Sequence, residues 1–522
     1  MDRRVAQGRL PASRDDRDSF RNVDSRASDG RIAARLASVA IGVALVAIAL
    51  YVYTFSHPYR FYDHFEWQAQ AFLEGQAAIR YPVAASADSP GNFFFQDVLP
   101  VASSDGVSRG LIPFPPLPAL VLIPFVAAWG RAADGQLIFA IIGAIDVGIA
   151  WWVLGRLPIR RWVRLAGTVF LGFGTVLWYA AQIGTTWYQA HVIAVGLALL
   201  AVGLAIGADP EAATDEPAEF DDDVETGPPD GQPAAHGHGS SQVRAGGGQD
   251  RGLPVRARAL AGGISGRQFL AGFLFGLACT ARLTMIFAAP FFLFVGGGGS
   301  WLRRGWSAGL GAAIPIAGLV IYNVVATGHL FNPAYDYLYH LEAGFYTALN
   351  YNTAWGIEDP QYLPQNIGIM FFSTPAIAPD VVPATLGGGP SLCTVPGAMR
   401  TLFDASCPIA LPRDIGMSVI LTSPAYLLLA ASFKGRGRSR LVGGAFLAVF
   451  LIAIVNLMHF SQGWVQFGYR FSLDFLPCAL VLVALGMDRL RSAPAVITAG
   501  ALIVASIAVN LWGVVMGNAL GW

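Results

Sequence analysis

Residues 33–55 read AARLASVAIGVALVAIALYVYTF. A run of about 20 mostly apolar residues is long enough to cross a lipid bilayer as a helix. The whole chain repeats this character, since 54% of its 522 residues are hydrophobic, only 13% are charged and the mean hydropathy is +0.50. Ordinary soluble domains carry roughly 25% charged residues. The sequence therefore predicts an all-α polytopic membrane protein.

Apolar runs of this kind recur along the chain, and we expect about eleven transmembrane helices. Two short runs in the middle of the chain could together form one kinked element. The expected spans are 33–55, 135–154, 164–181, 187–207, 268–283, 284–299, 306–325, 414–433, 441–460, 473–488 and 494–516.

Basic residues fix the expected orientation, because cytoplasmic loops are enriched in Arg and Lys. The formal net charge is zero, which excludes a basic nucleic-acid binder. With a cytoplasmic N-terminus, most of the basic residues fall on the inner side of the membrane. The inner segments are then 1–32, 155–163, 208–267, 300–305, 434–440 and 489–493.

The chain then divides into four parts. Residues 1–32 form a polar cytoplasmic tail, and residues 33–207 form an N-terminal transmembrane module with a first outer loop at 56–134. Residues 208–267 are acidic and then rich in Gly, Pro and Arg, a composition typical of a disordered linker. Residues 268–522 form a C-terminal transmembrane module, with a second outer loop at 326–413.

The run from Ile112 to Gly130 also resembles a span. Counting it as one would place Arg156, Arg160 and Arg161 outside, against the charge bias. We therefore expect a juxtamembrane or re-entrant helix on the outer face, started by the prolines at 113–118.

Residues 62–76, just beyond the first span, read YDHFEWQAQAFLEGQ. Helical spacing places Asp63, Glu66 and Gln70 on one side, with apolar side chains opposite, which predicts an amphipathic helix lying on the membrane. Asp63 followed by Glu66 also resembles a capping box, in which case both carboxylates are structural. A carboxylate that is fixed at the membrane surface is equally a suitable general base.

Three further stretches place polar side chains at outer helix ends. His191 lies about one turn inside the fourth span and should face the bundle interior, because an unpaired histidine is costly in a membrane. Arg282 ends a span, where it could reach lipid phosphates. Arg470 and Asp474 are four residues apart, so they could form a plain salt bridge, or Asp474 could orient Arg470 toward a phosphate.

Together these motifs resemble the GT-C superfamily of integral-membrane glycosyltransferases. The branch in question is the bacterial one that is related to protein O-mannosyltransferases and lipid A aminoarabinose transferases. In that family an acidic residue comes just after the first helix, and Glu often follows it directly. Here His64 follows Asp63 instead. The second acidic role then falls to Glu66 or to another part of the chain. The matching stretches are Asp63-His64 with Ala69, Ala71-Phe72-Leu73 and Gly75, Pro113-Phe114-Pro115-Pro116, the Arg282 helix, and Gly468-Tyr469-Arg470 with Asp474 and Pro477.

The resemblance implies a donor sugar on a polyprenyl phosphate and transfer to an acceptor hydroxyl of a glycan, lipid or protein, with inversion, at the outer face of the plasma membrane. It implies Asp63 as the base with Glu66 as the second choice, and Arg470 and Arg282 as phosphate ligands. His64, His191 and Asp474 would support them. The resemblance implies no particular cofactor, and it does not decide whether a divalent metal takes part. A transporter or flippase for a lipid-linked glycan, and a non-catalytic envelope assembly protein, are the alternatives.

The four cysteines predict one disulfide. Cys393 and Cys407 lie in the second outer loop, in a compartment that permits oxidation. Cys279 and Cys478 lie within expected spans and should stay reduced.

Overall fold

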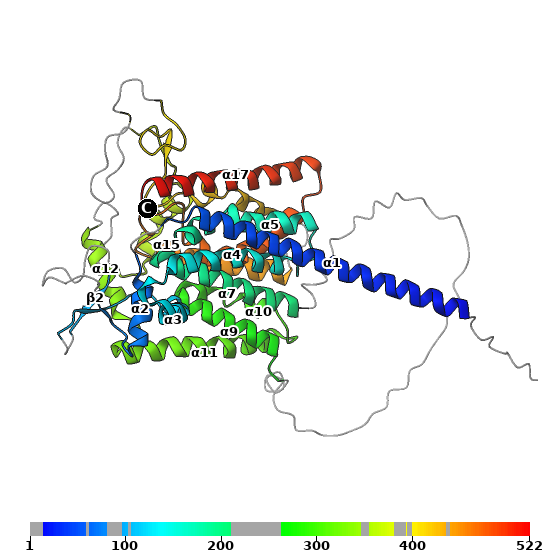
Figure 1. Cartoon of the computed structure of the whole chain (residues 1–522), viewed down its shortest axis with the longest axis horizontal. Helices are drawn as coiled ribbons and strands as arrows, with labels where there is room; N and C mark the ends of the chain where they lie inside the picture. Colours follow the sequence, from blue (N-terminus) through cyan, green and yellow to red (C-terminus); the bar gives the residue numbers. More distant parts are fainter. Residues whose placement is uncertain are drawn as a thin grey trace, which may run out of the picture.

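The computed structural model describes residues 14–58, 62–80, 97–102, 106–209, 263–345, 354–379, 393, 399–434 and 439–522. Figure 1 shows long helices running side by side in one bundle, with the start of α1 projecting beyond one end. The long elements are α1 (Arg14–Phe55), α4 (Gly135–Leu154), α5 (Arg161–Phe173), α6 (Leu177–Ile183), α7 (Thr186–Ala208), α9 (Gly266–Ala281), α11 (Trp301–Thr327), α15 (Arg440–Met458), α16 (Ser472–Asp488) and α17 (Ala493–Ala519).

Within the described residues, six helices are long and apolar enough to cross a membrane. They are Ile32–Phe55 in α1, and α4, α7, α11, α15 and α17. The pair α5 and α6, bent by 47°, makes a seventh if it counts as one span. A polytopic helical protein is thus confirmed, whereas the predicted number of eleven spans is not.

Each of the other predicted spans is helical but short. The run 268–283 is the 16-residue α9, and 473–488 is the 17-residue α16. The run 284–299 splits into the 3₁₀ helix η3 (Leu283–Ala288) and α10 (Phe291–Phe294) around Pro290, and 414–433 splits into α14 (Val419–Thr422) and η7 (Pro424–Phe433). Proline cannot donate the backbone hydrogen bond that a continuous helix needs, which explains both breaks.

Small residues allow close packing between α9 and α11. A Cβ at Gly272 would overlap the carbonyl oxygen of Ala308, and one at Gly311 would overlap that of Phe269. Such close backbone approach is how helices associate where apolar burial alone gives no advantage over lipid. The α9–α11 pair therefore needs glycine at both positions.

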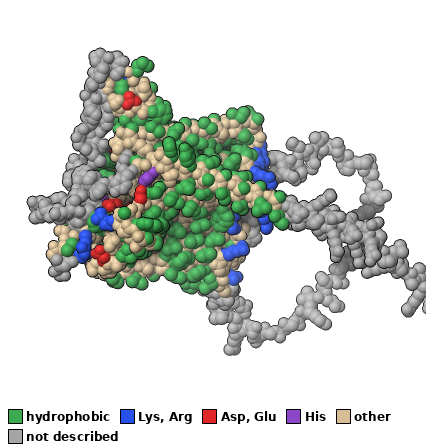
Figure 2. Space-filling view, viewed as in Figure 1, with side chains coloured by type: hydrophobic (Ala, Val, Ile, Leu, Met, Phe, Trp, Pro, Cys, Tyr) green, Lys and Arg blue, Asp and Glu red, His purple; other side chains and the backbone are tan. Residues whose placement is uncertain are grey.

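The two ends of the bundle differ in charge. Arg156, Arg160, Arg267, Arg303 and Arg440 lie at one end, here called the basic end, where α4, α7 and α16 finish. Figure 2 shows the blue side chains gathered there, whereas red, purple and blue mix at the opposite end, here called the loop end. Figure 1 places the C-terminus at the loop end and the start of α1 beyond the basic end. The two ends of the chain thus lie at opposite ends of the bundle. Which end faces the cytoplasm stays a prediction.

The first predicted outer loop folds into two helices and a small sheet at the loop end. They are α2 (His64–Leu73), α3 (Leu117–Trp129) with the short η2 (Gly130–Ala132), and strands β1 (Ile79–Arg80), β2 (Leu99–Val101) and β3 (Arg109–Leu111) in the antiparallel order β1-β3-β2. The apolar run after the prolines forms α3, a 13-residue helix that packs on α2. Its place on the outer face of the membrane stays a prediction.

The prediction that α2 is an amphipathic helix lying on the membrane is wrong. Both of its faces are buried, including Glu66 at 3% and Gln68 at 0% exposure. The polar side chains are buried because other elements supply partners; Gln68, for example, donates to the Tyr322 hydroxyl of α11 at 3.2 Å. The capping box is also absent, since Asp63 is the N-cap of α2 without a side-chain capping hydrogen bond.

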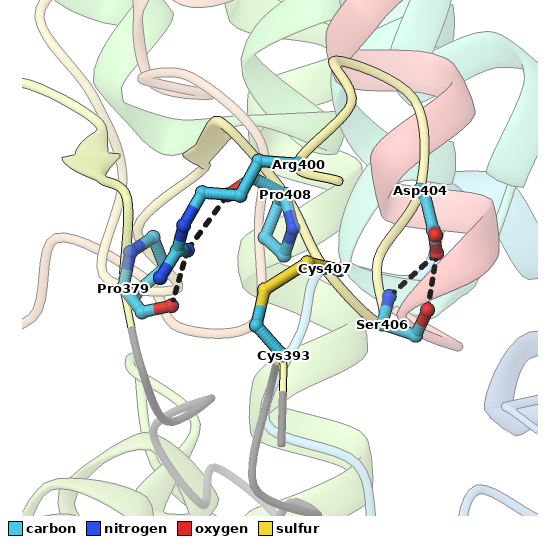
Figure 3. Close-up of a disulfide and its surroundings, with 7 residues drawn as sticks. All are labelled: Pro379, Cys393, Arg400, Asp404, Ser406, Cys407 and Pro408. Atoms are coloured by element: carbon cyan, nitrogen blue, oxygen red, sulfur yellow. Dashed lines mark hydrogen bonds between the residues drawn. A yellow bond between two sulfur atoms is a disulfide. The ribbon is translucent and has the colours of Figure 1, made fainter. Parts of the chain in front are cut away.

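The second predicted outer loop holds α12 (Pro333–Phe345), η5 (Pro360–Tyr362), α13 (Leu363–Ile367), the π-helical η6 (Gly368–Phe372) and the strand pair β4 (Ala376–Ile377) and β5 (Ala410–Leu411). The predicted disulfide between Cys393 and Cys407 is present, with Cα atoms 4.9 Å apart (Figure 3). Arg400 beside it donates to the carbonyl oxygens of Pro379 and Pro408. Cys279 and Cys478 are free and buried, also as predicted. Most of the predicted linker, residues 210–262, lies outside the described residues.

Candidate functional site

The first turn of α7 joins two groups of polar side chains at the loop end. Thr186 and Gln189 are three residues apart and share one face, which contacts α2. Tyr188 and His191 share the other face, which contacts the segment that leads into α16. We call the α2 side the acidic site (Asp63, His64, Glu66, Asp97) and the α16 side the arginine site (His191, Arg282, Arg470, Phe471, Asp474).

Asp63 lies at the start of α2, where its side chain is partly buried and close to a cation. Its Oδ2 is 3.9 Å from Arg131 Nη2, and the Arg131 guanidinium lies 3.2 Å above the ring of Trp67. Burial raises the pKa of Asp63, while the charges of His64 and Arg131 oppose that rise. Its Oδ1 is buried and has no hydrogen-bond partner among the described residues.

Glu66 is more deeply buried and holds its proton more tightly. Burial, together with the nearby carboxylates of Asp63 and Asp134, raises the pKa of Glu66 to about 8. A Cβ at Gly135 would overlap its Oε1, so the carboxyl group packs directly on the first turn of α4. At neutral pH Glu66 is therefore mainly the neutral acid, and Asp63 is the better general base of the two.

His64 ties the acidic site to α7 and to the first loop. Its Nδ1 is 3.0 Å from Thr186 Oγ1, and its Nε2 is 3.0 Å from Asp97 Oδ1. The same Thr186 hydroxyl donates to the carbonyl oxygen of Tyr62 at 3.0 Å. His64 is fully buried, so it positions the start of α2 and does not reach a solvent-exposed substrate.

Asp474 is the centre of the arginine site. Arg282 donates to both of its carboxylate oxygens, Thr284 donates to Oδ2 at 2.6 Å, and His191 Nδ1 lies 3.0 Å from Oδ1. Asp474 is 1% exposed, and a buried carboxylate needs such compensation. As predicted, His191 faces the bundle interior; its Nε2 has no hydrogen-bond partner among the described residues.

Arg470 does not pair with Asp474, contrary to one of the two sequence interpretations. It precedes α16, which begins at Ser472, so helical spacing does not bring the two side chains together. Instead its guanidinium lies 5.4 Å from the ring of Phe471 and 5.7 Å from that of Tyr188. Gly463 makes this position possible, because a Cβ there would lie 2.8 Å from Arg470 Cζ.

The two arginines therefore differ in what remains for a ligand. The guanidinium of Arg282 is neutralised by the two oxygens of Asp474. Arg470 has no carboxylate within 4 Å in the described ranges, and its buried Nε has no hydrogen-bond partner. A half-buried cation without a counter-ion favours an anionic ligand. Of the two predicted phosphate ligands, Arg470 is the more available.

The predicted residues thus fall into two neighbouring groups. Arg282, Arg470, His191 and Asp474 meet around Phe471, and Asp63, His64 and Glu66 meet at the start of α2 on the other face of α7. Sequence reasoning missed Arg131, Asp97, Gln189 and Thr284. Gln189 is two residues from His191, which the sequence analysis names, whereas the other three carry no local pattern. Across the described part of the chain, no three His, Cys, Asp or Glu side chains are grouped so as to hold a metal ion.

Comparison with known proteins gives one match in structure. No protein-family model matches the sequence, and no curated protein matches it. The fold is similar to the crystal structure of ArnT from Cupriavidus metallidurans bound to undecaprenyl phosphate, with a TM-score of 0.38 and 12% sequence identity. The similarity covers 92% of this chain and 76% of that one. At this identity and TM-score, the similarity assigns no role to any residue of this chain.

Proposed function

We propose that the protein is an inverting glycosyltransferase that moves a sugar from a polyprenyl phosphate to an acceptor hydroxyl at the outer face of the plasma membrane. The observation that carries this proposal is the arginine site. It places a cation that has no counter-ion among the described residues at the loop end of a helical membrane bundle, beside a second arginine that Asp474 holds in place. A lipid phosphate at the membrane surface is the anion that such a position suits.

The donor phosphate would bind to Arg470, with Arg282 adding positive charge beside it. When the bond between the anomeric carbon and the phosphate oxygen breaks, the leaving polyprenyl phosphate gains a negative charge. Fixed cations in a site that is shielded from water stabilise such developing charge strongly. Arginine suits this role because its planar guanidinium binds two phosphate oxygens at once.

The acceptor hydroxyl needs a base, and we assign this role to Asp63. Its carboxylate would take the proton as the hydroxyl oxygen attacks the anomeric carbon from the side opposite the phosphate. Direct displacement of this kind inverts the anomeric configuration. Glu66, which keeps its proton at neutral pH, would remain the second choice and mainly hold the start of α4 against α2.

The orientation that we propose places the basic end in the cytoplasm and both sites outside. It is supported by the gathering of arginines at the basic end. The lipid tail of the donor would then lie in the bilayer and its phosphate at the outer surface, level with the arginine site.

The test is the binding of polyprenyl phosphate to the full-length protein in lipid nanodiscs. We expect Arg470→Gln to weaken binding by about tenfold or more, because a charge-assisted hydrogen-bond pair is lost. Arg413→Gln is the matched control, since the exposed Arg413 donates only to the carbonyl oxygen of Thr374. Equal affinity of Arg470→Gln and the unmodified protein would refute the phosphate site. Movement of a lipid-linked glycan across the membrane without sugar transfer would favour a flippase instead.

A further inference from the structure

A third group of polar side chains lies at the loop end, outside both sites described above. His459 Nδ1 is 2.8 Å from Glu358 Oε1, and His459 Nε2 is 3.1 Å from the Tyr335 hydroxyl. The three residues come from three separate segments: α12, the segment before η5, and the residue that follows α15. We call them the Glu358–His459–Tyr335 network.

Backbone pairing holds the network in place. Glu358 and His459 form an isolated antiparallel bridge, in which Phe460 donates to Ile357 at 2.9 Å and Asp359 donates to Met458 at 2.8 Å. The side chain of the buried Asn366 then donates to the carbonyl oxygen of His459 at 2.8 Å. A side chain fixed by so many backbone bonds loses little freedom when a ligand binds.

A buried aromatic layer packs beside the network. It consists of Tyr339, Tyr362 and Phe460, which are at most 2% exposed. Tyr335 and Trp355 pack against this layer and remain partly exposed. The network therefore combines fixed polar groups with partly exposed aromatic rings.

The network adjoins the arginine site. The ring of His459 lies 6.1 Å from that of Phe471, which in turn lies 5.2 Å from the guanidinium of Arg282. Tyr335 and Glu358 are close enough to act electrostatically on Arg282. A molecule that contacts the network is thus next to the position proposed for the donor phosphate.

The chemistry of the network selects the kind of molecule. Glu358 is a carboxylate whose side chain is 44% exposed, so that it accepts hydrogen bonds and repels anions. Aromatic edges suit a ligand with an apolar side and a polar rim. A neutral carbohydrate meets all of these conditions, because its hydroxyl groups donate hydrogen bonds and its ring carbons pack on aromatic side chains.

We propose that the Glu358–His459–Tyr335 network binds the acceptor, and that the acceptor is a neutral glycan. This inference rests on the proposed glycosyl transfer and names its acceptor class. Glu358 accepts hydrogen bonds from glycan hydroxyls, and His459 fixes the carboxylate of Glu358 and the hydroxyl of Tyr335. These are positioning residues, and the acceptor proton goes to Asp63 as above.

The experiment compares Glu358→Gln and His459→Gln with the unmodified full-length protein in nanodiscs. The probes are a neutral oligosaccharide, its phosphorylated form and a serine-containing peptide, each titrated for binding. Loss of one hydrogen bond to a charged group should weaken binding of the neutral oligosaccharide by about tenfold to a hundredfold. In transfer assays we expect a higher acceptor KM at nearly unchanged kcat. We expect no loss of affinity for polyprenyl phosphate, because Glu358→Gln removes a negative charge near Arg282.

The chain offers a matched control in the Asp336–His340 pair of α12. It is also a carboxylate and a histidine, 3.6 Å apart, but both side chains are more than half exposed. Asp336→Asn and His340→Gln should leave oligosaccharide binding unchanged. Glu358→Gln keeps the size of the side chain at a partly exposed position, so it remains informative if His459→Gln does not fold.

Three results would overturn the inference. They are unchanged oligosaccharide affinity in Glu358→Gln, a fall in kcat at constant KM, and preference of the unmodified protein for the phosphorylated probe or the peptide. If the oligosaccharide does not bind to the unmodified protein but polyprenyl phosphate does, the acceptor inference fails and the proposed phosphate site stands. Conversely, failure of polyprenyl phosphate to bind refutes the proposed function even if the oligosaccharide binds. The two failures are therefore distinguishable.

Discussion

Arg282 donates from Nε and Nη2 to the two carboxylate oxygens of Asp474, at 3.1 and 2.9 Å. The two residues are 192 positions apart in the sequence and come from the end of α9 and the first turn of α16. This pair, and not the nearby Arg470, compensates the buried charge of Asp474. It joins the two predicted transmembrane elements at the loop end, and it leaves Arg470, the proposed phosphate ligand, without a carboxylate partner in the part of the chain that the structure describes.

Asp474→Asn should destabilise the protein strongly. The substitution leaves Arg282 buried without its counter-ion, and breaking a buried pair typically costs about 3 to 5 kcal/mol. We expect a clearly lower unfolding temperature in detergent. Asp404→Asn is the control, because Asp404 is exposed and accepts hydrogen bonds from Ser406 and Cys407 of its own turn. Equal melting of the two variants would mean that the pair contributes little to stability.

Asp63→Asn and Glu66→Gln should separate the two carboxylates by function. If Asp63 is the base, its substitution lowers the transfer rate by about a hundredfold or more, while membrane insertion and folding stay intact. Glu66→Gln mimics the protonated side chain and should change the rate at neutral pH by less than about threefold. Full activity of Asp63→Asn, with loss in Glu66→Gln, would reverse the assignment.

Much of the helical framework could be predicted from the sequence, because apolar runs of spanning length are a local property. The run 135–154 coincides with α4, and 187–207 lies within α7. The number of spans was harder to predict than the positions of the long helices, because Pro290 and Pro424 divide apolar runs that hydropathy alone treats as continuous. The burial of α2 could not be predicted either, because its polar side chains meet Thr186 and Gln189 of α7 and Tyr322 of α11, which are distant in sequence.

The site was only partly predictable for a similar reason. Asp63, Arg282 and Arg470 stand out because charge is rare in such a chain. Their partners are distant in sequence, however, so that the spacing of Arg470 and Asp474 suggested a pair that does not form. His459 and Glu358 belong to no local pattern and are brought together only by the pairing of their backbones.

The two chain ends should lie on opposite sides of the membrane. Reporter fusions after Gly207 and after Trp522 are expected to report the cytoplasmic and the outer side, respectively, because the arginine-rich basic end should face the cytoplasm. A fusion after Trp522 that reports the cytoplasm would contradict the predicted odd number of spans. The short elements within 268–299 would then be the first to reassign.

The stability of the protein should fall as pH rises between about 5 and 8. Glu66 keeps its proton in the folded protein up to about pH 8, whereas the unfolded chain loses it near the ordinary pKa of 4.5. The folded state therefore binds more protons, and the unfolding free energy decreases by up to about 1.4 kcal/mol per pH unit in that range. Melting curves of the unmodified protein and Glu66→Gln across this range test the effect. The variant should show a flatter profile, and parallel profiles would exclude Glu66 as the titrating group.

Loss of the Cys393–Cys407 disulfide should destabilise the second outer loop without disturbing the transmembrane bundle. The bond links residues 14 positions apart, and closing a loop of this size contributes about 3 kcal/mol in the chain-entropy model. The Trp512 indole of α17 donates to the carbonyl oxygen of Leu402 at 3.0 Å, so that the loop is also held to the bundle.

We therefore expect the double substitution Cys393→Ser and Cys407→Ser to make the loop sensitive to proteases, while polyprenyl phosphate binding persists. Cys279→Ser is the control, because Cys279 is a free thiol buried in α9. Mass spectrometry of protein purified without reductant should find the peptides of Cys393 and Cys407 linked. Recovery of both as free thiols, or equal protease resistance of all three proteins, would show that the bond does not stabilise the loop in the membrane-bound protein.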